Sequence, residues 1–397
     1  MANQKPLLSE FPWDPRYGIS NVDDILTPAL IVYPDLIASN IDRTVQLLNG
    51  DANRWRVHMK TAKLGYTLRM LAERGVHNFK CATTLELLVA CQSGASDVLL
   101  AYPVMGANAR RAQQIAAEFP AVRISVLAEN ESQLQQWRGS KVGIFLDLNS
   151  GMNRTGIEQN HSGQVGALVR AIGQLGLEFR GLHFYDGHLG GMPELERTRI
   201  AHAGYDSLLK LVAEIQRSRA SVPELITAGT PAMPCSLSYE PFRTGRFTHR
   251  VSPGTVVYND ASSLADLPSD YGFAPAVLVL TRVVSHPRPG TITCDAGHKS
   301  VSADAGVPTC LVVGHPELTP LAPSEEHLPI QVNDGSSGPE VGSPLFLLPR
   351  HICPTVNNFD AALIAREGQI LAVESVTARG HEAPLLRHTE QSVPVVR

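Results

Sequence analysis

A lysine at the end of a short apolar strand is the best-placed candidate for a catalytic amine in this chain. Lys60 follows the segment RVHM within RVHMKTAK, residues 56–63. An amine held at a strand end can form a Schiff base with the carbonyl group of a cofactor. The other interpretation is a solvated surface charge, which is the usual state of a lysine side chain. This short segment alone leaves both interpretations open.

A histidine and a cysteine two residues apart are the second candidate group. His351 and Cys353 occur in PRHICPTVN. In an extended segment their side chains point to one face and can bind the same cation. Two ligands are too few for a closed structural site, so positions remain for water or substrate oxygens. A soft thiolate beside an imidazole favours zinc over magnesium or manganese, although two such ligands alone often bind nothing.

A repeating strand–helix pattern in the first two thirds of the chain must position the lysine. Eight strands with nearly continuous apolar residues alternate with helices, which predicts a closed parallel (β/α)8 barrel over residues 29–263. An open doubly wound sheet is the alternative, but no G-x-G-x-x-G follows the first strand. The expected strands are Ala29–Tyr33 and those within RVHMK, NFKCAT, DVLLAYP, RISVLAEN, KVGIFLDLN, EFRGLHFYD and ELITAG.

The last third of the chain has short β-rich runs separated by Pro, Gly and Asp turns. This pattern predicts a β domain over residues 264–397, and that domain contains the His–Cys pair. Residues 1–28 form a polar, proline-bearing lead-in that we expect to pack with the β domain. The predicted fold class is therefore α/β, with a (β/α)8 barrel followed by a C-terminal β domain.

Composition excludes several classes of function. The 397 residues are 43% hydrophobic and 18% charged, with a formal charge of -4, which is typical of soluble globular proteins and offers no basic excess for nucleic acid. No apolar run reaches the ~20 residues of a membrane span, and MANQKPLLSEFPWDP lacks the pattern of a secretory signal, so we expect a cytoplasmic protein. The six cysteines lack C-x-x-C spacing, which argues against a disulfide framework.

Functional groups of such a barrel gather where strands end and the loops to the helices begin. The residues at those positions are Lys60, Thr83, Tyr102, Asn149, Arg154, Tyr185, His188, Gly229 and Thr230. They belong to an ordered series of motifs, RVHMKTAK, LNSGMNRTGI, FYDGHL, TAGTP, VSPGTVVYND, DAGHKSVSAD, EEH and PRHICPTVN. This series resembles the alanine-racemase-like (fold type III) family of pyridoxal phosphate enzymes, most closely its D-threonine aldolase and D-serine dehydratase branch. The resemblance covers almost the whole chain.

The resemblance implies a cofactor, a metal and an assembly. Lys60 would form the Schiff base with pyridoxal 5'-phosphate, and burial near other cations would lower its pKa, as a lysine nucleophile requires. A divalent metal, zinc by its ligands, would bind His351 and Cys353. The protein would be a homodimer with the partner's β domain near each site. The implied cofactor contacts are His58, Lys60, Arg154, Tyr185, Gly229, Thr230, Gly254, Thr255 and Tyr258.

Several of these contacts also have a physical rationale. Arg154 can donate to the cofactor's phenolate oxygen, although an exposed arginine is the alternative. The two Gly-Thr pairs offer backbone N–H groups and hydroxyls to a phosphate, because small residues permit close approach. Tyr185 would meet the pyridine ring or only line the barrel mouth. His58 shares the face of Lys60 on a strand, either beside the cofactor or as a structural histidine.

β-Hydroxy D-amino acids are the substrates that the resemblance implies. The leading prediction is a D-threonine aldolase-like cleavage to glycine and an aldehyde; the alternative is dehydration of D-serine or D-3-hydroxyaspartate to a keto acid and ammonia. In the family the dehydratases carry H-x-C and the aldolases H-x-D, but the PTVN that follows is aldolase-like, so both reactions stay open. His188 is the candidate acid or base at the β-hydroxyl, with a structural histidine as the alternative.

Two other functions fit the same motifs less well. An amino-acid racemase would need a second base opposite Lys60 and no metal, which leaves the His–Cys pair without a role. A non-catalytic pyridoxal phosphate carrier of barrel type ends without a β domain. The roughly 130 residues after the barrel form a domain-sized segment, which argues against a carrier.

Overall fold

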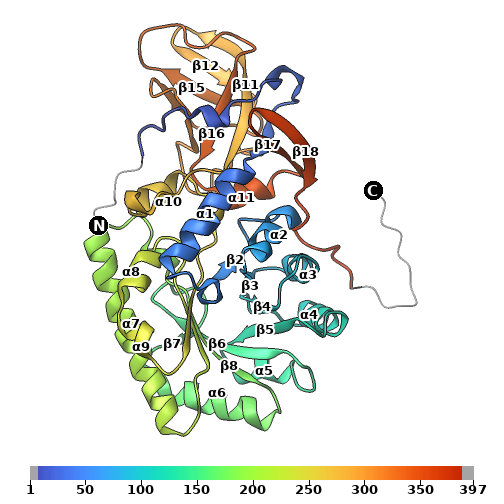
Figure 1. Cartoon of the computed structure of the whole chain (residues 1–397), viewed down its shortest axis with the longest axis vertical. Helices are drawn as coiled ribbons and strands as arrows, with labels where there is room; N and C mark the ends of the chain where they lie inside the picture. The colour runs from blue at the N-terminus through green and yellow to red at the C-terminus, as the bar shows by residue number, and fades with distance from the viewer. Residues whose placement is uncertain (1–7, 387–397) are drawn as a thin grey trace.

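A computed structural model describes residues 8–386 and consists of a strand barrel ringed by helices, with a β domain at one end (Figure 1). The barrel strands are β2 (Arg56–His58), β3 (Asn78–Cys81), β4 (Asp97–Leu100), β5 (Arg123–Ala128), β6 (Gly143–Asn149), β8 (Phe179–Phe184), β9 (Glu224–Thr227) and β10 (Thr248–Val251). They run parallel in the order β10-β9-β8-β6-β5-β4-β3-β2. A parallel bridge between Trp55 and Val251 joins the two edges. The predicted barrel is therefore confirmed.

The first expected strand is not part of this barrel. β1 (Ala29–Val32) pairs antiparallel with β11 and parallel with β17, both in the β domain. The eighth barrel strand is β10, which the sequence reading missed. β10 reads Thr-His-Arg-Val, and such a short polar segment lacks the apolar run expected of a buried strand. The barrel proper thus starts at β2, the strand that leads to Lys60.

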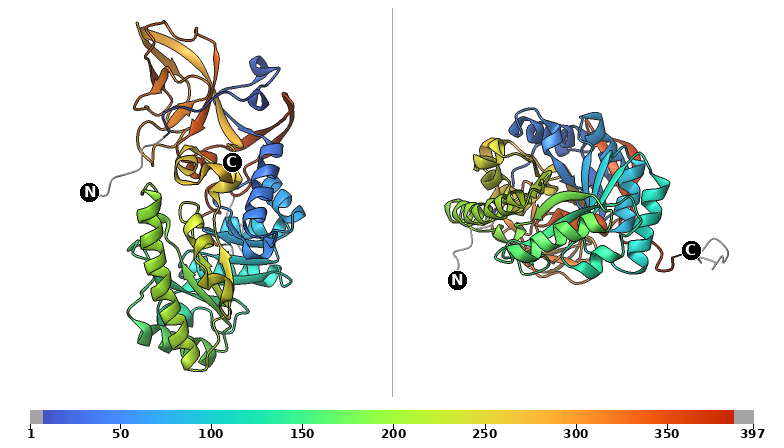
Figure 2. Two further views of the ribbon diagram at one scale, coloured as in Figure 1. Left: turned by 60° about the vertical axis from the view of Figure 1, so that its left-hand side comes forward. Right: turned by 90° about the horizontal axis from the view of Figure 1, so that it is seen from below.

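Helices cover the outside of the barrel between successive strands, as the view along the barrel shows (Figure 2). They are α2 (Gly65–Glu73), α3 (Thr84–Gln92), α4 (Ala107–Glu118), α5 (Glu131–Gln135), α6 (Ser162–Gln174), α7 (Glu194–Arg217), α8 (Met233–Ser238) and α9 (Pro241–Thr244). A two-residue strand, β7 (Ile157–Glu158), pairs with the end of β6. α1 (Pro34–Leu47) begins at a proline, whose fixed φ suits a first helical turn, and buries Leu36, Ile37 and Ile41.

The β domain is a nine-stranded, mostly antiparallel sheet that includes β1. Its other strands are β11 (Val277–Arg288), β12 (Thr291–Cys294), β13 (Cys310–Val312), β14 (Leu318–Pro320), β15 (Leu328–Val332), β16 (Pro344–Pro349), β17 (Ala361–Arg366) and β18 (Gln369–Ser375). Two helices lie where this domain meets the barrel, α10 (Ala261–Asp266) and α11 (Ile352–Asn357). The expected boundary between residues 263 and 264 falls inside α10.

The lead-in contacts the β domain through aromatic side chains. The ring of Trp13 lies 5.4 Å from that of Phe346 on β16. The hydroxyl of Tyr17 donates to the carbonyl of Pro275 at 2.9 Å.

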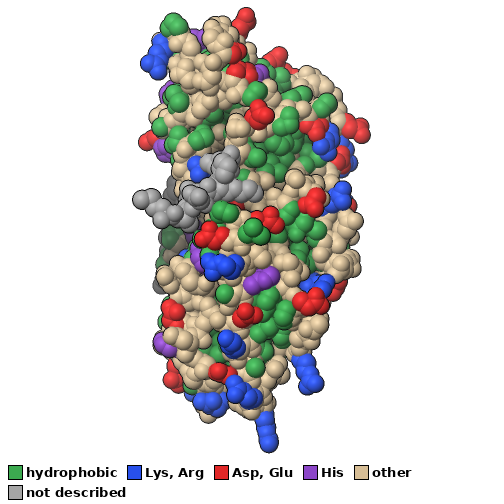
Figure 3. Space-filling view, turned by 90° about the vertical axis from the view of Figure 1, so that its left-hand side faces the viewer, with side chains coloured by type: hydrophobic (Ala, Val, Ile, Leu, Met, Phe, Trp, Pro, Cys, Tyr) green, Lys and Arg blue, Asp and Glu red, His purple; other side chains and the backbone are tan. Residues whose placement is uncertain are grey.

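Among residues 8–386 no helix is long and apolar enough to cross a membrane. On the face drawn in Figure 3, acidic and basic side chains are interspersed; the cytoplasmic location stays a prediction.

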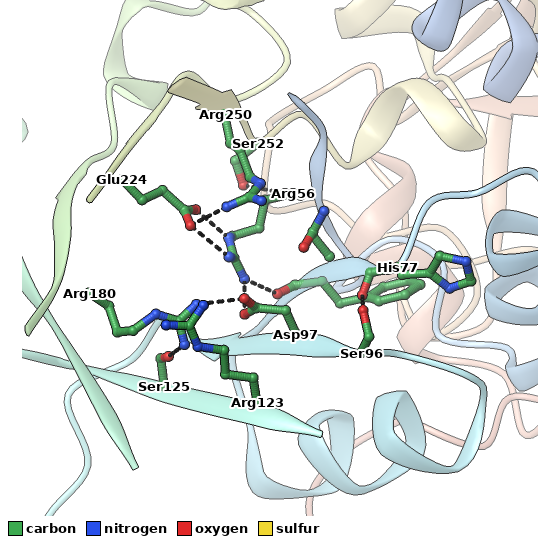
Figure 4. A network of polar contacts seen from close by, with 12 residues as sticks. Arg56, His77, Ser96, Asp97, Arg123, Ser125, Arg180, Glu224, Arg250 and Ser252 are labelled. Atoms are coloured by element: carbon green, nitrogen blue, oxygen red, sulfur yellow. Dashed lines mark hydrogen bonds and ion pairs between the residues drawn. The ribbon is translucent and has the colours of Figure 1, made fainter. Parts of the chain in front are cut away.

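The barrel interior is layered, and a network of buried charges fills its lower end (Figure 4). Arg56 binds Asp97 at 2.8 Å and Glu224 at 2.9 Å. Arg180 binds the other oxygen of Asp97 at 2.5 Å, and Arg250 also pairs with Glu224. The next layer is apolar and consists of Leu99, Leu127, Phe145 and Ile226. These layers close the barrel from below, so its open end lies at the carboxyl ends of the strands.

Candidate active site

A cavity of about 640 Å³ opens where the barrel meets the β domain. Its walls come from the loops after β2, β8, β9 and β10, from α10, and from the loops at residues 305 and 350–351. The predicted residues that line this cavity are His58, Lys60, Tyr185, Gly229, Thr230, Gly254, Thr255 and His351. The structure therefore brings together, in one space, the candidate amine, the candidate phosphate contacts and one candidate metal ligand.

Lys60 reaches this cavity, whereas the nearby Lys63 does not. The ammonium of Lys63 is buried against Glu86 at 2.6 Å. Burial alone would lower the pKa of Lys60, but Tyr185 and Cys353 outweigh burial, and its pKa is raised. The expectation of a lowered pKa is therefore wrong for the protein without its cofactor, because two acidic groups face this amine as well as the cations. The position of Lys60 still fits a Schiff-base lysine.

A second lysine, Lys80, lies below Lys60 inside the barrel. Its amine is fully enclosed, 3.4 Å from Nε2 of His183. Burial and the charge of Lys60 lower the pKa of Lys80 to about 7. Nδ1 of His183 in turn lies 2.7 Å from Asp147. The sequence reading missed Lys80, although a charged residue in the middle of the apolar strand NFKCAT was a signal.

Tyr185 is surrounded by cations. The centre of its ring lies 5.8 Å from the amine of Lys60, 5.2 Å from that of Lys80 and 5.2 Å from the guanidinium carbon of Arg154. Cations prefer the electron-rich face of an aromatic ring, so these contacts fix the ring at the cavity wall. The neighbouring Asp186 is buried, which raises its pKa to about 6.

Two glycines and a threonine fit a bound phosphate. A Cβ at Gly254 would lie 2.2 Å from the carbonyl oxygen of His58, and one at Gly229 would lie 2.9 Å from the ring of Tyr185. Only glycine permits such close backbone approach. The hydroxyl of Thr230 is buried at the cavity and has no hydrogen-bond partner within the described residues. These features match the phosphate group of pyridoxal phosphate, because a phosphate oxygen would satisfy that hydroxyl.

The His–Cys pair sits at the start of α11 and not in an extended segment as expected. His351 has extended backbone angles, but Cys353 lies in the first turn of the helix. Burial opposes the charged form of each group, yet their interaction raises the pKa of His351 to about 9 and lowers the pKa of Cys353. A lowered thiol pKa favours the thiolate, which is the form that binds a metal ion. Nδ1 of His351 contacts Asp304 at 2.6 Å, which leaves Nε2 for a metal.

The protein supplies few ligands to such an ion. Within residues 8–386, no group of three or more His, Cys, Asp or Glu side chains is placed to enclose a metal. The sulfur of Cys353 also contacts the hydroxyls of Thr61 at 2.9 Å and Thr255 at 3.6 Å. The donor set fits an open site that water and substrate oxygens complete.

Four of the predicted residues are not among those that line the cavity: Cys353, Tyr258, His188 and Arg154. Tyr258 is fully buried, and its hydroxyl lies 2.8 Å from that of Thr67, so the structure does not place it at a cofactor site. His188 turns toward Gly151, where a Cβ would lie 3.5 Å from Nε2, and it is not among the cavity-lining residues. The positions of these two side chains depend on local turns of the backbone, which the spacing of residues in the sequence does not reveal. Arg154 lies outside the cavity wall, against Tyr185.

Known protein families match the two parts of the chain that form this cavity, the barrel and the β domain. The family model described as "Alanine racemase, N-terminal domain" matches residues 32–262, which is more than half of the chain. The chain belongs to this family. A second model, "Putative serine dehydratase domain", matches residues 276–365. The alanine racemase-like barrel therefore carries a β domain that is itself similar to a dehydratase domain.

Relatives of this family member are lyases by name. It is 26% identical over 391 residues to a D-threonine aldolase from Arthrobacter, covering 93% of this chain and 96% of the relative. A 3-hydroxy-D-aspartate aldolase from Paracoccus denitrificans is also 26% identical, with coverage of 90% and 93%. A D-threo-3-hydroxyaspartate dehydratase from Delftia is 24% identical, with coverage of 87% and 95%. The chain thus aligns with nearly the full length of two aldolases and of a dehydratase.

A solved structure supports the same architecture for this alanine racemase-like chain. The crystal structure of D-threonine aldolase from Filomicrobium marinum superimposes with a TM-score of 0.82 at 25% sequence identity. The match covers 92% of this chain and 98% of the aldolase. The barrel and the β domain are therefore both shared with an aldolase of known structure.

Proposed function

We propose that this chain is a pyridoxal phosphate- and divalent-metal-dependent lyase that cleaves β-hydroxy D-amino acids into glycine and an aldehyde. One observation carries the proposal. Lys60 and His351 line the same cavity, and the sulfur of Cys353 contacts the cavity-lining Thr255 at 3.6 Å. A racemase has no use for a thiolate–imidazole pair at that place, whereas a lyase that acts on a β-hydroxyl needs a Lewis acid there.

The cofactor end of the cavity binds the phosphate and supplies the amine. When bound, pyridoxal phosphate links to an amine through its aldehyde and draws electrons from the bonds at the substrate's α-carbon. Lys60 is the amine. The hydroxyl of Thr230 and the backbone at Gly229 and Gly254 hold the phosphate. Arg154 does not line the cavity but stacks on the ring of Tyr185 at 5.2 Å, and its guanidinium would donate to the phenolate oxygen of the bound cofactor.

The β-domain end of the cavity positions the β-hydroxyl. A divalent metal held by His351 and Cys353, zinc by the softness of the thiolate, would acidify that hydroxyl. His58 faces the same cavity, and burial and the charge of Lys60 hold its pKa well below 6.5, so its imidazole is neutral. A neutral imidazole can accept the hydroxyl proton. In this role His58 replaces His188, which lies outside the cavity wall.

A dehydratase is the second candidate, because the chain carries a cysteine where aldolases of this branch carry an aspartate. In that reaction Lys60 would take the α-proton, and a metal held by His351 and Cys353 would make the β-hydroxyl a better leaving group. Loss of water gives an enamine, whose imine form is hydrolysed by water to a keto acid and ammonia. The decisive experiment incubates the metal-loaded holoenzyme with D-threonine, D-serine and D-3-hydroxyaspartate. Glycine and an aldehyde support the aldolase, whereas keto acid with equimolar ammonia and no glycine would replace it by the dehydratase.

We also infer a homodimer. The edge strand β18 exposes Leu371 and Val373, which are 57% and 68% accessible. Exposed apolar side chains on an unpaired strand edge commonly mark a protein interface. Light scattering of the purified holoenzyme tests this: a mass of two chains is expected, and a mass of one chain at micromolar concentration contradicts it.

A further inference from the structure

Arg350 is a cation in the cavity that the steps above do not use. It follows β16 directly, precedes His351, and lines the same cavity as Lys60. Its backbone is fixed on both sides: its N–H donates to Thr309 at 2.8 Å, and its carbonyl accepts from Ser262 at 3.3 Å. The position of the side chain is therefore set by the junction between β domain and α10.

The guanidinium of Arg350 has no anion of its own within residues 8–386. Nε is buried without a hydrogen-bond partner, and neither a hydrogen bond nor an ion pair of the side chain occurs among the described residues. One terminal nitrogen lies over Gly306, where a Cβ would be only 3.3 Å away. A guanidinium offers five donors. Nε of Arg350 is buried, whereas the residue as a whole is half-buried at the cavity wall, so its donors can reach a ligand in the cavity.

The fully buried arginines of the described residues are paired: Arg56 and Arg180 bind Asp97, and Arg197 binds Asp266 at 3.1 Å. Arg350 is only half-buried, but it lines the cavity with a buried Nε and has no anionic partner within the described residues.

The carboxylates that line the cavity are engaged elsewhere. Asp260 accepts from the backbone N–H of Ser263 at 2.7 Å and of Ile352 at 3.0 Å. Asp266 accepts from Gly191 at 2.9 Å and holds Arg197. An anion for Arg350 must therefore come from the ligand.

We propose, on the basis of the lyase function proposed above, that Arg350 selects substrates whose β-carbon carries a second carboxylate. Lys60 fixes the α-carbon, and the adjacent His351 fixes the β-hydroxyl. Arg350 lines the same cavity as Lys60 and His351, so its guanidinium is available to the substituent of the β-carbon. Arginine binds a carboxylate through two parallel N–H donors, which gives both charge and shape selectivity. The preferred substrate is a 3-hydroxy D-amino diacid, ahead of an analogue with a methyl group at that place.

Steady-state kinetics with two substrates test this selection. The wild-type enzyme, Arg350→Met and Arg350→Lys are compared on D-3-hydroxyaspartate and D-threonine. Arg350→Met is expected to lower kcat/KM for the diacid by about 10- to 100-fold and for D-threonine by less than about threefold. Arg350→Lys retains the charge but cannot donate two parallel hydrogen bonds. Its kcat/KM for the diacid is expected to lie between the values of wild type and Arg350→Met. Equal losses on both substrates would overturn the proposal, because they would assign Arg350 to the shared α-carboxylate.

A binding experiment keeps this proposal separate from the reaction itself. Calorimetry on the holoenzyme compares succinate with butyrate, which lack any reactive hydroxyl. Wild type is expected to bind succinate at least about tenfold more tightly, and Arg350→Met is expected to lose the difference. Arg366→Met, which removes an exposed arginine of β17, is the matched control and retains it. If no β-hydroxy amino acid is cleaved, the lyase proposal fails, whereas an unchanged succinate preference in Arg350→Met overturns the role of Arg350.

Discussion

The hydroxyl oxygen of Thr61 lies 2.9 Å from the sulfur of Cys353, although 292 positions separate the two residues in the chain. Thr61 follows Lys60 directly at the end of β2, and Cys353 lies in α11 of the β domain. This contact ties the candidate amine to the candidate metal ligand across the junction of the two domains. The reaction therefore depends on the docking of the β domain as well as on the barrel.

The cysteine of the pair is expected to hold the metal. Cys353→Ala removes a thiolate ligand, and we expect metal affinity to fall by at least about tenfold, measured by metal analysis after dialysis against a weak chelator. Cys235→Ala is the matched control, because Cys235 is buried, does not line the cavity and has a raised pKa. Equal metal content in wild type and Cys353→Ala would remove the metal site.

Substitutions of Lys60 and of Lys80 are expected to have opposite effects on the visible absorbance of the bound cofactor. Lys60→Ala is expected to lose the visible absorbance of the cofactor–lysine link, because its amine is the one that lines the cavity. Lys80→Met removes a more deeply buried amine, 5.2 Å from the ring of Tyr185, that does not line the cavity, so we expect it to keep this absorbance. Absorbance titration with pyridoxal phosphate checks both variants, and a retained band in Lys60→Ala would disprove the assignment.

The fold could be read from the sequence to the extent that burial leaves a pattern. Continuous apolar runs marked seven of the eight barrel strands, because strands covered on both faces need them. The same rule failed at β1 and β10. β1 is as apolar as a barrel strand, and nothing in its own residues says that it pairs with the β domain. β10 contains Thr248, His249 and Arg250, so it lacks the pattern although it closes the barrel.

The candidate site shows a similar division. Lys60 and His351 lie at strand ends, where the barrel rule and the motifs agree, and the structure places both at one cavity. His188 does not line the cavity, because the short turn after Asp186 directs its side chain toward Gly151. Arg350 lies within the motif PRHICPTVN, but its importance depends on having no partner among the described residues, which only side-chain positions reveal.

The charge network below the barrel makes stability depend on acid. Burial alone would raise the pKa of Asp97, but Arg56 and Arg180 outweigh it and lower the pKa from 3.8 to about 2. A carboxylate with a depressed pKa stabilises the fold above its unfolded value of about 4, and this stabilisation is lost as the pH falls toward 2. The shift corresponds to about 2 kcal/mol.

Asp97→Asn is therefore expected to lower the free energy of unfolding by about 2 to 4 kcal/mol at pH 7, because two buried arginines lose a charged partner. The difference from wild type should shrink between pH 4 and pH 3. Urea unfolding at each pH measures it. Asp360→Asn, which removes an exposed partner of Arg379, is expected to change little at any pH, and a constant Asp97→Asn effect down to pH 3 would contradict the pKa assignment.

Glycine at position 254 is expected to be required for the cavity. In Gly254→Ala the new Cβ meets the carbonyl oxygen of His58 at 2.2 Å, a backbone atom that cannot move independently. We expect a lower melting temperature and at least about tenfold weaker cofactor binding, since overpacking typically costs 1–3 kcal/mol. Gly173→Ala meets no atom within 4 Å in α6 and is expected to be neutral or stabilising. Similar melting temperatures for the two variants would contradict this role.

The unsatisfied hydroxyl of Thr230 makes the sharpest test of the cofactor site. Thr230→Val removes a buried group that has no partner within the described chain, so we expect the apoenzyme to be as stable as wild type or up to about 1 kcal/mol more stable. The same change removes a donor to the phosphate, and pyridoxal phosphate should bind about tenfold more weakly in a fluorescence titration. Thr227→Val is the matched control, because its hydroxyl lies 2.7 Å from both Ser236 and His249. That variant should destabilise the apoenzyme by about 1–3 kcal/mol and leave cofactor affinity nearly unchanged. If a phosphate binds Thr230, then Thr230→Val loses cofactor affinity without losing stability, and Thr227→Val loses stability without losing cofactor affinity. A loss of apoenzyme stability in both variants would instead make Thr230 a purely structural residue.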